Sequence, residues 1–306
     1  MNTPASAFHD FDQPVSPPAV WSQTRPFYWS LRRELWEYRS IYLAPLAVAA
    51  VYLFGFMIST IHLPAKLRAL DPAKQQAALQ QPYNFVALLI MLTTFLIAIL
   101  YCLEAFQGER RDRSALFWKS LPVSDLTTVL AKAFVVIAII PLLTLGVTIV
   151  TQWLMFLVSS AVLAGSGIGV STLTSNVPLG MMQLLLFYHL IAIHGLWYAP
   201  IYGWLLLVSA WARRVAFLWA ALPLLAIGFV EKIAFNTTHF GKLFSNRISG
   251  GGGQGELFSG NGIPMHPLGH LHPGGFLMSP GLWIGLAVTA AFLAAAARMR
   301  RNRGPV

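Results

Sequence analysis

Long apolar stretches separated by short polar segments dominate this chain. An α-helix needs about 20 apolar residues to cross roughly 30 Å of hydrocarbon, and six stretches reach that length. They are predicted at residues 41–62, 83–106, 128–158, 181–210, 215–235 and 276–297. The pattern therefore predicts an all-α, polytopic membrane protein with six transmembrane helices.

Two of these stretches, 128–158 and 181–210, are longer than a bilayer requires, and each contains a proline, Pro141 or Pro200. Proline lacks a backbone donor, and its ring clashes with the preceding helical turn. We therefore expect these helices to be tilted, to extend beyond the membrane, or to break at the prolines.

The composition agrees with a membrane protein. Hydrophobic residues make up 56% of the chain and charged residues only 10%, whereas about 25% is typical of soluble domains. The net charge of +10 comes from Lys and Arg that flank the apolar stretches and suit anionic lipid, so no nucleic-acid partner is expected. The single cysteine, Cys102, excludes an intrachain disulfide.

An even number of spans places both chain ends on one side of the membrane. Segments on that side hold Arg25, Arg32, Arg33, Arg39, Arg110, Arg111, Arg113, Lys119, Lys132, Arg213, Arg214, Arg298, Arg300, Arg301 and Arg303. Segments on the other side hold Lys66, Arg68, Lys74, Lys232, Lys242 and Arg247. The excess of positive charge predicts that both termini are cytoplasmic.

The N-terminal region is polar and has no apolar core of a cleaved signal. Residues 1–24 are predicted to be a disordered cytoplasmic leader, and residues 25–306 a single transmembrane domain. A helix over 25–40 has an apolar face and charged residues on much of the rest, so we expect it to lie in the membrane interface. That face carries Phe27, Leu31, Leu35 and Tyr38. The alternative is that this segment simply extends the first span.

The cytoplasmic loop at 107–127 joins a charged run to a short apolar segment that Pro122 ends, and Ser124 can cap the next helix. An aromatic cluster rimmed by charge is typical of a protein contact. A loop lying on the membrane with Trp118 in the interface remains the alternative. The candidate docking residues are Glu109, Arg110, Arg111, Asp112, Phe117 and Trp118.

Polar side chains within the spans are candidates for a substrate path. They are Gln152, His189, His194, Tyr198 and Tyr202, the last three at four-residue spacing. The alternative is an ordinary helix–helix contact in which these groups are satisfied.

The outer loop at 236–275 contains a glycine run that indicates a flexible linker, and three histidines that could bind Cu, Ni or Zn. These are His266, His270 and His272. Because no nearby carboxylate or cysteine completes a cage, no metal site is assigned. The chain has no G-x-x-x-x-G-K-[ST] phosphate loop, so we expect no ATPase, and no enzyme, in this chain.

The segment 109–124 reads E-R-R-D-R-S-A-L-F-W-K-S-L-P-V-S. It resembles the pattern E-R-x-x-x-S-x-x-F-x-x-S-L-P-V-S of the membrane permeases of type 2 ATP-binding-cassette (ABC) exporters. The resemblance implies that this region is a coupling helix that docks on a separate cytoplasmic ABC ATPase. It also implies a second permease chain, as a homodimer or heterodimer, in a bacterial cytoplasmic (inner) membrane. ATP and Mg would be bound by the partner, with no cofactor in this chain.

Two other functions remain open at this point. The chain could be a membrane anchor or sensor that recruits a cytoplasmic partner through the same loop without transport. It could also be a membrane-embedded enzyme that uses His189 or His194 with a metal or as a base. Neither the transported substrate nor the structure of the outer loop follows from the sequence.

Overall fold

The computed structural model describes residues 24–111, 124–212, 214–248 and 273–302, and all regular structure within them is helical. Six helical segments are long and apolar enough to cross a membrane. They are Ser40–Thr60 (α2), Lys74–Glu104 (in α4), Asp125–Gly165 (α7, η1 and α8), Val170–Trp197 (α9, α10 and η2), Ala216–Phe235 (α12) and Pro280–Asn302 (α15). The prediction of an all-α polytopic protein with six candidate spans is confirmed.

Helix α4 (Pro72–Glu104) begins earlier than the predicted stretch at 83–106. Its first residues are mostly Ala, Gln and Lys, which favour a helix although they are not apolar enough to count as a span. The short helix α3 (Leu63–Ala69) connects α2 to α4. Helix α4 therefore begins before the apolar stretch, because the residues that favour a helix start earlier in the sequence than the apolar residues do.

The two prolines act differently. The helical segment Asp125–Gly165 continues through Pro141, whereas near Pro200 the predicted stretch 181–210 is divided: one helical segment ends at Trp197 and the shorter apolar helix Ala199–Trp211 begins two residues later. A π-helical segment precedes each one: η1 (Val135–Ile139) lies before Pro141, and η2 (Leu190–Trp197) lies before Pro200. Because proline cannot donate to the carbonyl four residues earlier and its ring crowds that carbonyl, the preceding turn relaxes into wider i→i+5 bonding. One such bond joins the Tyr198 amide to the Ile193 carbonyl at 2.9 Å.

The two π-helical segments pack against each other inside the bundle. Their closest approach is at Gly195, where a Cβ atom would lie 3.0 Å from the Ile137 carbonyl oxygen. Only glycine gives the two backbones this separation without displacement.

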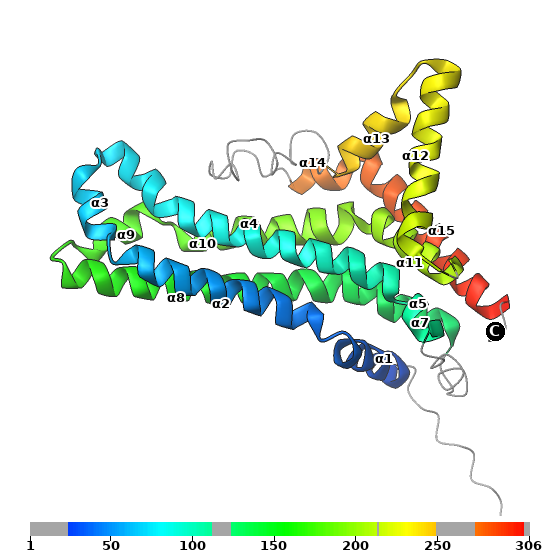
Figure 1. Cartoon of the computed structure of the whole chain (residues 1–306), viewed down its shortest axis with the longest axis horizontal. Coiled ribbons are helices and arrows are strands. Elements are labelled where there is room, and N and C mark those ends of the chain that lie inside the picture. The colour runs from blue at the N-terminus through cyan, green and yellow to red at the C-terminus, as the bar shows by residue number, and fades with distance from the viewer. Residues whose placement is uncertain (1–23, 112–123, 213, 249–272, 303–306) are drawn as a thin grey trace, which may run out of the picture.

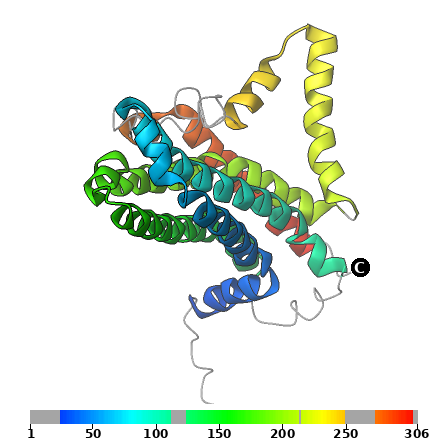
Figure 2. The same cartoon turned by 60° about the vertical axis from the view of Figure 1, so that its left-hand side comes forward.

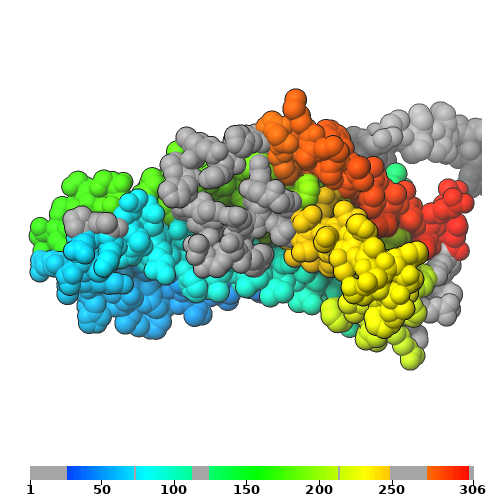
Figure 3. Space-filling model, turned by 90° about the horizontal axis from the view of Figure 1, so that it is seen from above, coloured from blue at the N-terminus to red at the C-terminus, as the bar shows by residue number. Residues whose placement is uncertain are grey.

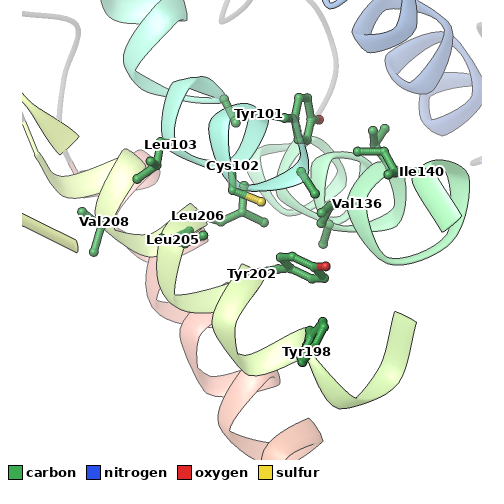
Figure 4. Close-up of a cluster of buried hydrophobic side chains, with 14 of the residues drawn as sticks. Tyr101, Cys102, Leu103, Val136, Ile140, Tyr198, Tyr202, Leu205, Leu206 and Val208 are labelled. Carbon is green, nitrogen blue, oxygen red and sulfur yellow. The ribbon is translucent and has the colours of Figure 1, made fainter. Parts of the chain in front are cut away.

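The bundle is built from α2, α4, α8 (Ile140–Gly165) and α11 (Ala199–Trp211), which pack side by side with α15 against α11. The larger hydrophobic cluster joins α4, η1, α8 and α11. Figure 4 shows Tyr202 and Leu206 on the face of α11 that lies nearest Cys102 of α4. A second cluster, around Tyr83 and Met155, fills the bundle nearer α3 and α9 (Val170–Asn176).

The ends of the bundle differ in the elements they collect. Helices α1 (Thr24–Glu37), α5 (Gln107–Arg111) and α7 (Asp125–Phe134) gather at one end with the last turns of α15 (Figure 1). Helices α3 and α9 lie at the opposite end, as the space-filling view also shows (Figure 3). The first and last described helices therefore reach the same end of the molecule.

Helix α12 extends away from the bundle (Figure 2), and only Ala216 and Ala220 on it are buried. Residues in the left-handed region flank it: Val215 with φ 51° and Asn236 with φ 49°. The chain returns through α13 (His239–Ile248) and, after an undescribed segment, α14 (Pro273–Met278). Most of the surface of α12 is therefore available to lipid or to another chain.

Candidate functional site

The candidate site lies where α4 ends and the 107–127 loop begins. The buried Ser209 side chain of α11 determines how the chain turns there. Its Oγ accepts hydrogen bonds from the Phe106 amide at 3.0 Å and the Gln107 amide at 3.3 Å, and donates to the Leu103 carbonyl at 2.8 Å. These contacts satisfy backbone groups that the end of α4 would leave open, and they direct the chain into α5.

Glu109 of α5 points into the protein and is 2% exposed. Its carboxylate accepts from Arg300 of α15 at 2.8 Å and from Arg33 of α1 at 3.0 Å. It also lies 3.1 Å from the Lys132 ammonium of α7. One carboxylate thus joins three helices that are distant in sequence to the start of the loop.

A second carboxylate, Glu34 of α1, completes this cluster and is 1% exposed. It accepts from Lys132 at 2.8 Å, from Arg33 at 2.7 Å and from the Tyr101 hydroxyl at 3.0 Å. We call the set Arg33, Glu34, Glu109, Lys132 and Arg300 the ion network. Because buried charges persist only when they are paired and hydrogen-bonded, the network fixes α1, α5, α7 and α15 relative to one another.

Aromatic rings and one further carboxylate surround the ion network. The Phe106 ring lies 5.3 Å from the Lys132 ammonium and 4.9 Å from the Arg300 guanidinium. The Arg300 guanidinium also donates to Asp125, at the start of α7, at 3.3 Å. The cations are therefore held both by carboxylates and by the negative face of a ring.

The neighbouring charges favour the ionised forms of Glu109 and Arg33. Burial alone would raise the pKa of Glu109, but Lys132, Arg300 and Arg33 outweigh burial and lower this pKa from 4.5 to about 2. Burial would lower the pKa of Arg33, but Glu34, Glu109 and Glu37 raise it above its ordinary value. Glu109 and Arg33 therefore stay ionised at neutral pH.

This pKa shift predicts how acid affects the protein. The folded-state pKa of Glu109 lies below its unfolded value, so its contribution to stability is present above about pH 4.5 and is lost as the pH falls toward about 2. We expect the unfolding temperature in detergent to fall below about pH 4.5, and Glu109→Gln to make that fall shallower. Asp71→Asn, at an exposed carboxylate, serves as the control and should leave the slope unchanged. An unchanged slope in Glu109→Gln would contradict this account.

The remaining side chains of α5 contact further helices. Gln107 accepts from the Ala216 amide, the first residue of α12, at 3.3 Å. Arg110 donates to the Ser209 carbonyl of α11 and, at 3.3 Å, to the Phe106 carbonyl. Gly108 packs against the Tyr38 hydroxyl, which lies 3.4 Å from the position of a Cβ. Gln107, Glu109 and Arg110 at the base of the loop thus contact α1, α7, α11, α12 and α15.

The predicted docking residues occupy different environments. Glu109 and Arg110 are predicted from the sequence to lie on a docking surface, whereas in the structure both side chains bind other helices of this chain. Arg111 is exposed. Asp112, Phe117 and Trp118 lie outside the described residues.

The predicted substrate-path residues fall in two separate places. His194 and Tyr198 pack against Phe95 of α4, and His189 packs against His194. Tyr202 is packed in the larger hydrophobic cluster. Gln152 is also buried, and donates to the Tyr83 carbonyl of α4 at 3.3 Å.

Tyr83 and Phe95 lie twelve residues apart (95 − 83), which is roughly 18 Å along a helix. Gln152 therefore does not share one site with the histidines.

Sequence reasoning missed most of the ion network. Glu34 lies on the same face of α1 as Leu31 and Tyr38, so an acidic residue on an apolar face was an available signal. Lys132 lies inside an apolar stretch, where a charge requires a partner. Neither signal shows that Glu34 and Lys132 pair with each other, because the two residues are 98 positions apart in the sequence.

Within the described ranges, no group of three or more His, Cys, Asp or Glu side chains is arranged to hold a metal ion. No protein-family model matches the chain, and no match is found among curated proteins or solved structures. The function is therefore inferred from the residues and their geometry.

Proposed function

We propose that this chain is the membrane-spanning permease subunit of an ABC exporter of type 2, driven by a separate cytoplasmic ATPase. The observation that carries the proposal is the position of α5. It starts the 107–127 loop and contacts α1, α7, α11, α12 and α15. A partner that moves this loop would therefore move several spans together.

The ion network gives the loop a rigid base. In this proposal Glu109 and Arg110 hold α5 to the spans, while Arg111, Asp112, Phe117 and Trp118 form the surface for the ATPase. A force applied to the loop would then reach the spans. Packed interiors are hard to compress, so α5 and the spans bound to it would move together between discrete arrangements. ATP binding and closure of the ATPase pair would then rock the spans and alternate access across the membrane.

The exposed apolar helices support a second permease chain. α2 and α12 carry large apolar side chains on their outer faces, among them Phe54, Phe217 and Phe229. Such faces suit lipid or a neighbouring apolar helix. We propose that part of this surface is covered by a second permease chain, identical or related, with the path between the two chains.

The positive-inside bias supports placing the ion network at the cytoplasmic face of a bacterial inner membrane. The exposed aromatic residues of α1, Tyr28, Trp29 and Trp36, would then lie at headgroup depth. The apolar face of α1 that the sequence predicts carries Phe27, which instead packs against Phe134 of α7, with ring centres 5.7 Å apart.

Replacing Trp118 by alanine tests the docking surface. A large aromatic anchor at a protein interface typically contributes 2 kcal/mol or more, so we expect ATPase binding to weaken by about 30-fold. The measurement is co-purification of the ATPase, together with ATP-driven transport in vesicles. Trp283→Ala, which removes an exposed tryptophan from α15, is the matched control.

Two outcomes would limit or overturn this proposal. Unchanged co-purification and transport in Trp118→Ala would contradict it. Docking that Trp118→Ala weakens, but with no ATP-dependent transport by the wild type, would favour an anchor that recruits the ATPase without moving a substrate.

A further inference from the structure

Helix α1 turns away from the first span instead of continuing it. It ends at Glu37, and α2 begins at Ser40. Figures 1 and 2 show that the two helices run in different directions. Helix α1 packs beside α7 at the flank of the bundle, short of the point that the last turns of α15 reach (Figure 1). With α2 across the membrane, α1 therefore runs along the membrane surface.

One face of α1 is bound to the bundle. Glu34 on this face is 1% exposed and joins the ion network, and the Phe27 ring packs against Phe134 of α7. The Tyr38 ring lies 4.9 Å from the Tyr101 ring of α4. The face that the sequence predicts to lie in the membrane interface is thus used for packing within the chain, so lipid can meet only the opposite face.

The opposite face of α1 is aromatic and basic. At about 100° per residue, four of its side chains fall within an arc of roughly 100°, and one arginine follows directly after the helix. These residues, which we call the aromatic–basic stripe, are Tyr28, Trp29, Arg32, Trp36 and Arg39. The three aromatic side chains are between 58% and 67% exposed, and both arginines are exposed. Large apolar surface and positive charge therefore lie together on one side of this helix.

The charges of the stripe are all positive. The Arg32 guanidinium lies 5.3 Å from the centre of the Trp29 ring, a cation–π contact that holds the charge over the aromatic surface. Among the described residues, neither arginine of the stripe forms an ion pair. The acidic residues of α1 are engaged elsewhere: Glu34 in the ion network, and Glu37 with Arg33 at 3.9 Å. An anionic partner would therefore balance the stripe.

A surface of anionic phospholipid fits both properties of the stripe. Trp and Tyr rings favour the headgroup level of a bilayer, whereas arginine is attracted to the negative surface of the cytoplasmic leaflet. The stripe runs for roughly 16 Å along α1, which suits an extended surface. A cytoplasmic protein could also accept aromatic residues and arginine. The stripe, however, begins beside a spanning helix and faces outward from the flank of the bundle, where headgroups lie.

We propose that the aromatic–basic stripe binds anionic phospholipid headgroups of the cytoplasmic leaflet. The proposal is independent of the transport function, because it needs only this chain in a bilayer. Since the other face of α1 belongs to the ion network, the lipid contact also sets the depth at which the base of the 107–127 loop lies.

The test uses the purified full chain in vesicles of equal parts phosphatidylcholine and phosphatidylglycerol, without an ATPase. A trace of one lipid or the other carries a photoactivatable group in its headgroup, and the labelled residues are mapped by mass spectrometry. One arginine near an anionic surface strengthens the attraction about fivefold. We therefore expect the phosphatidylglycerol probe to label residues 28–39 at least about fivefold more than the phosphatidylcholine probe.

Paired replacements test the charges. Arg32→Gln with Arg39→Gln should bring the ratio of the two labels at 28–39 close to one, because it removes both charges of the stripe. Arg298→Gln with Arg301→Gln, at exposed arginines of α15, removes the same net charge elsewhere and should leave the ratio unchanged. Thermal unfolding in detergent verifies that each variant is folded.

A second pair tests the aromatic rings. Trp29→Ala with Trp36→Ala should lower labelling of 28–39 by both probes, since the rings draw the helix to headgroup depth. Unchanged labelling in this variant would contradict the proposal.

Equal labelling of 28–39 by the two probes in the wild type would overturn the proposal, as would a ratio that persists after both arginines of the stripe are replaced. Absence of labelling by either probe would also overturn it, and would favour a cytoplasmic protein as the partner. Because no ATPase is present in these measurements, their failure would leave the proposed transport function untouched.

Discussion

Replacing Lys132 by methionine is expected to lower the free energy of unfolding by about 3–5 kcal/mol, the typical cost of breaking a buried ion pair. Lys132 is 0% exposed, and its single ammonium lies 2.8 Å from Glu34 and 3.1 Å from Glu109. Methionine retains the bulk of the side chain but leaves two buried carboxylates short of a cation. The measurement is thermal or denaturant unfolding of the purified chain in detergent.

Two comparisons make this result specific. Lys74→Met removes an exposed lysine that is 3.8 Å from Asp71, so it should cost less than about 1 kcal/mol. Adding Glu34→Gln to Lys132→Met should recover part of the loss, because it removes one of the two uncompensated charges. If Lys132→Met unfolds like the wild type, the ion network does not hold these helices.

The second large effect is expected from Ser209→Ala. Losing this hydroxyl leaves the Phe106 and Gln107 amides and the Leu103 carbonyl without the partner they have now. A buried group left unsatisfied costs about 1–3 kcal/mol, so the junction between α4 and α5 should loosen. Faster hydrogen exchange of the amides at 105–111 would report that loosening.

Ser160→Ala is the matched control for this variant. Ser160 donates only within its own helix, to the Phe156 carbonyl at 2.7 Å, so its loss should leave exchange at 105–111 unchanged. Under the proposed function, Ser209→Ala should also reduce coupled transport without preventing ATPase binding. Equal exchange at 105–111 in Ser209→Ala and in the wild type would show that α5 does not depend on this contact.

The helices were predictable to the extent that hydropathy determines them. Apolar length alone identified six spans, because crossing hydrocarbon imposes a minimum length on a helix. Apolar length could not show that α4 begins at Pro72, because the first residues of α4 are polar and are helical through their intrinsic helix propensity. It also could not decide how the chain accommodates Pro141 and Pro200, where widening and breaking both relieve the clash.

The candidate site was predictable only in part, because its pairs join distant segments. Glu109 and Arg300 are 191 residues apart, and nothing local in the sequence indicates that α5 meets the end of α15. The histidines show a related difficulty. A period of 3.6 residues places His189 and His194 on different faces, and only the π-helical phase brings them together.

The most direct test of the central claim is a photo-crosslink from the docking surface. A benzoylphenylalanine in place of Trp118, in cells that contain the ATPase, should form an adduct with a cytoplasmic protein that carries a G-x-x-x-x-G-K-[ST] phosphate loop. The yield of that adduct should change when ATP hydrolysis by the ATPase is blocked. A position 118 that is labelled from outside intact cells, or one that crosslinks only to lipid, would contradict the account.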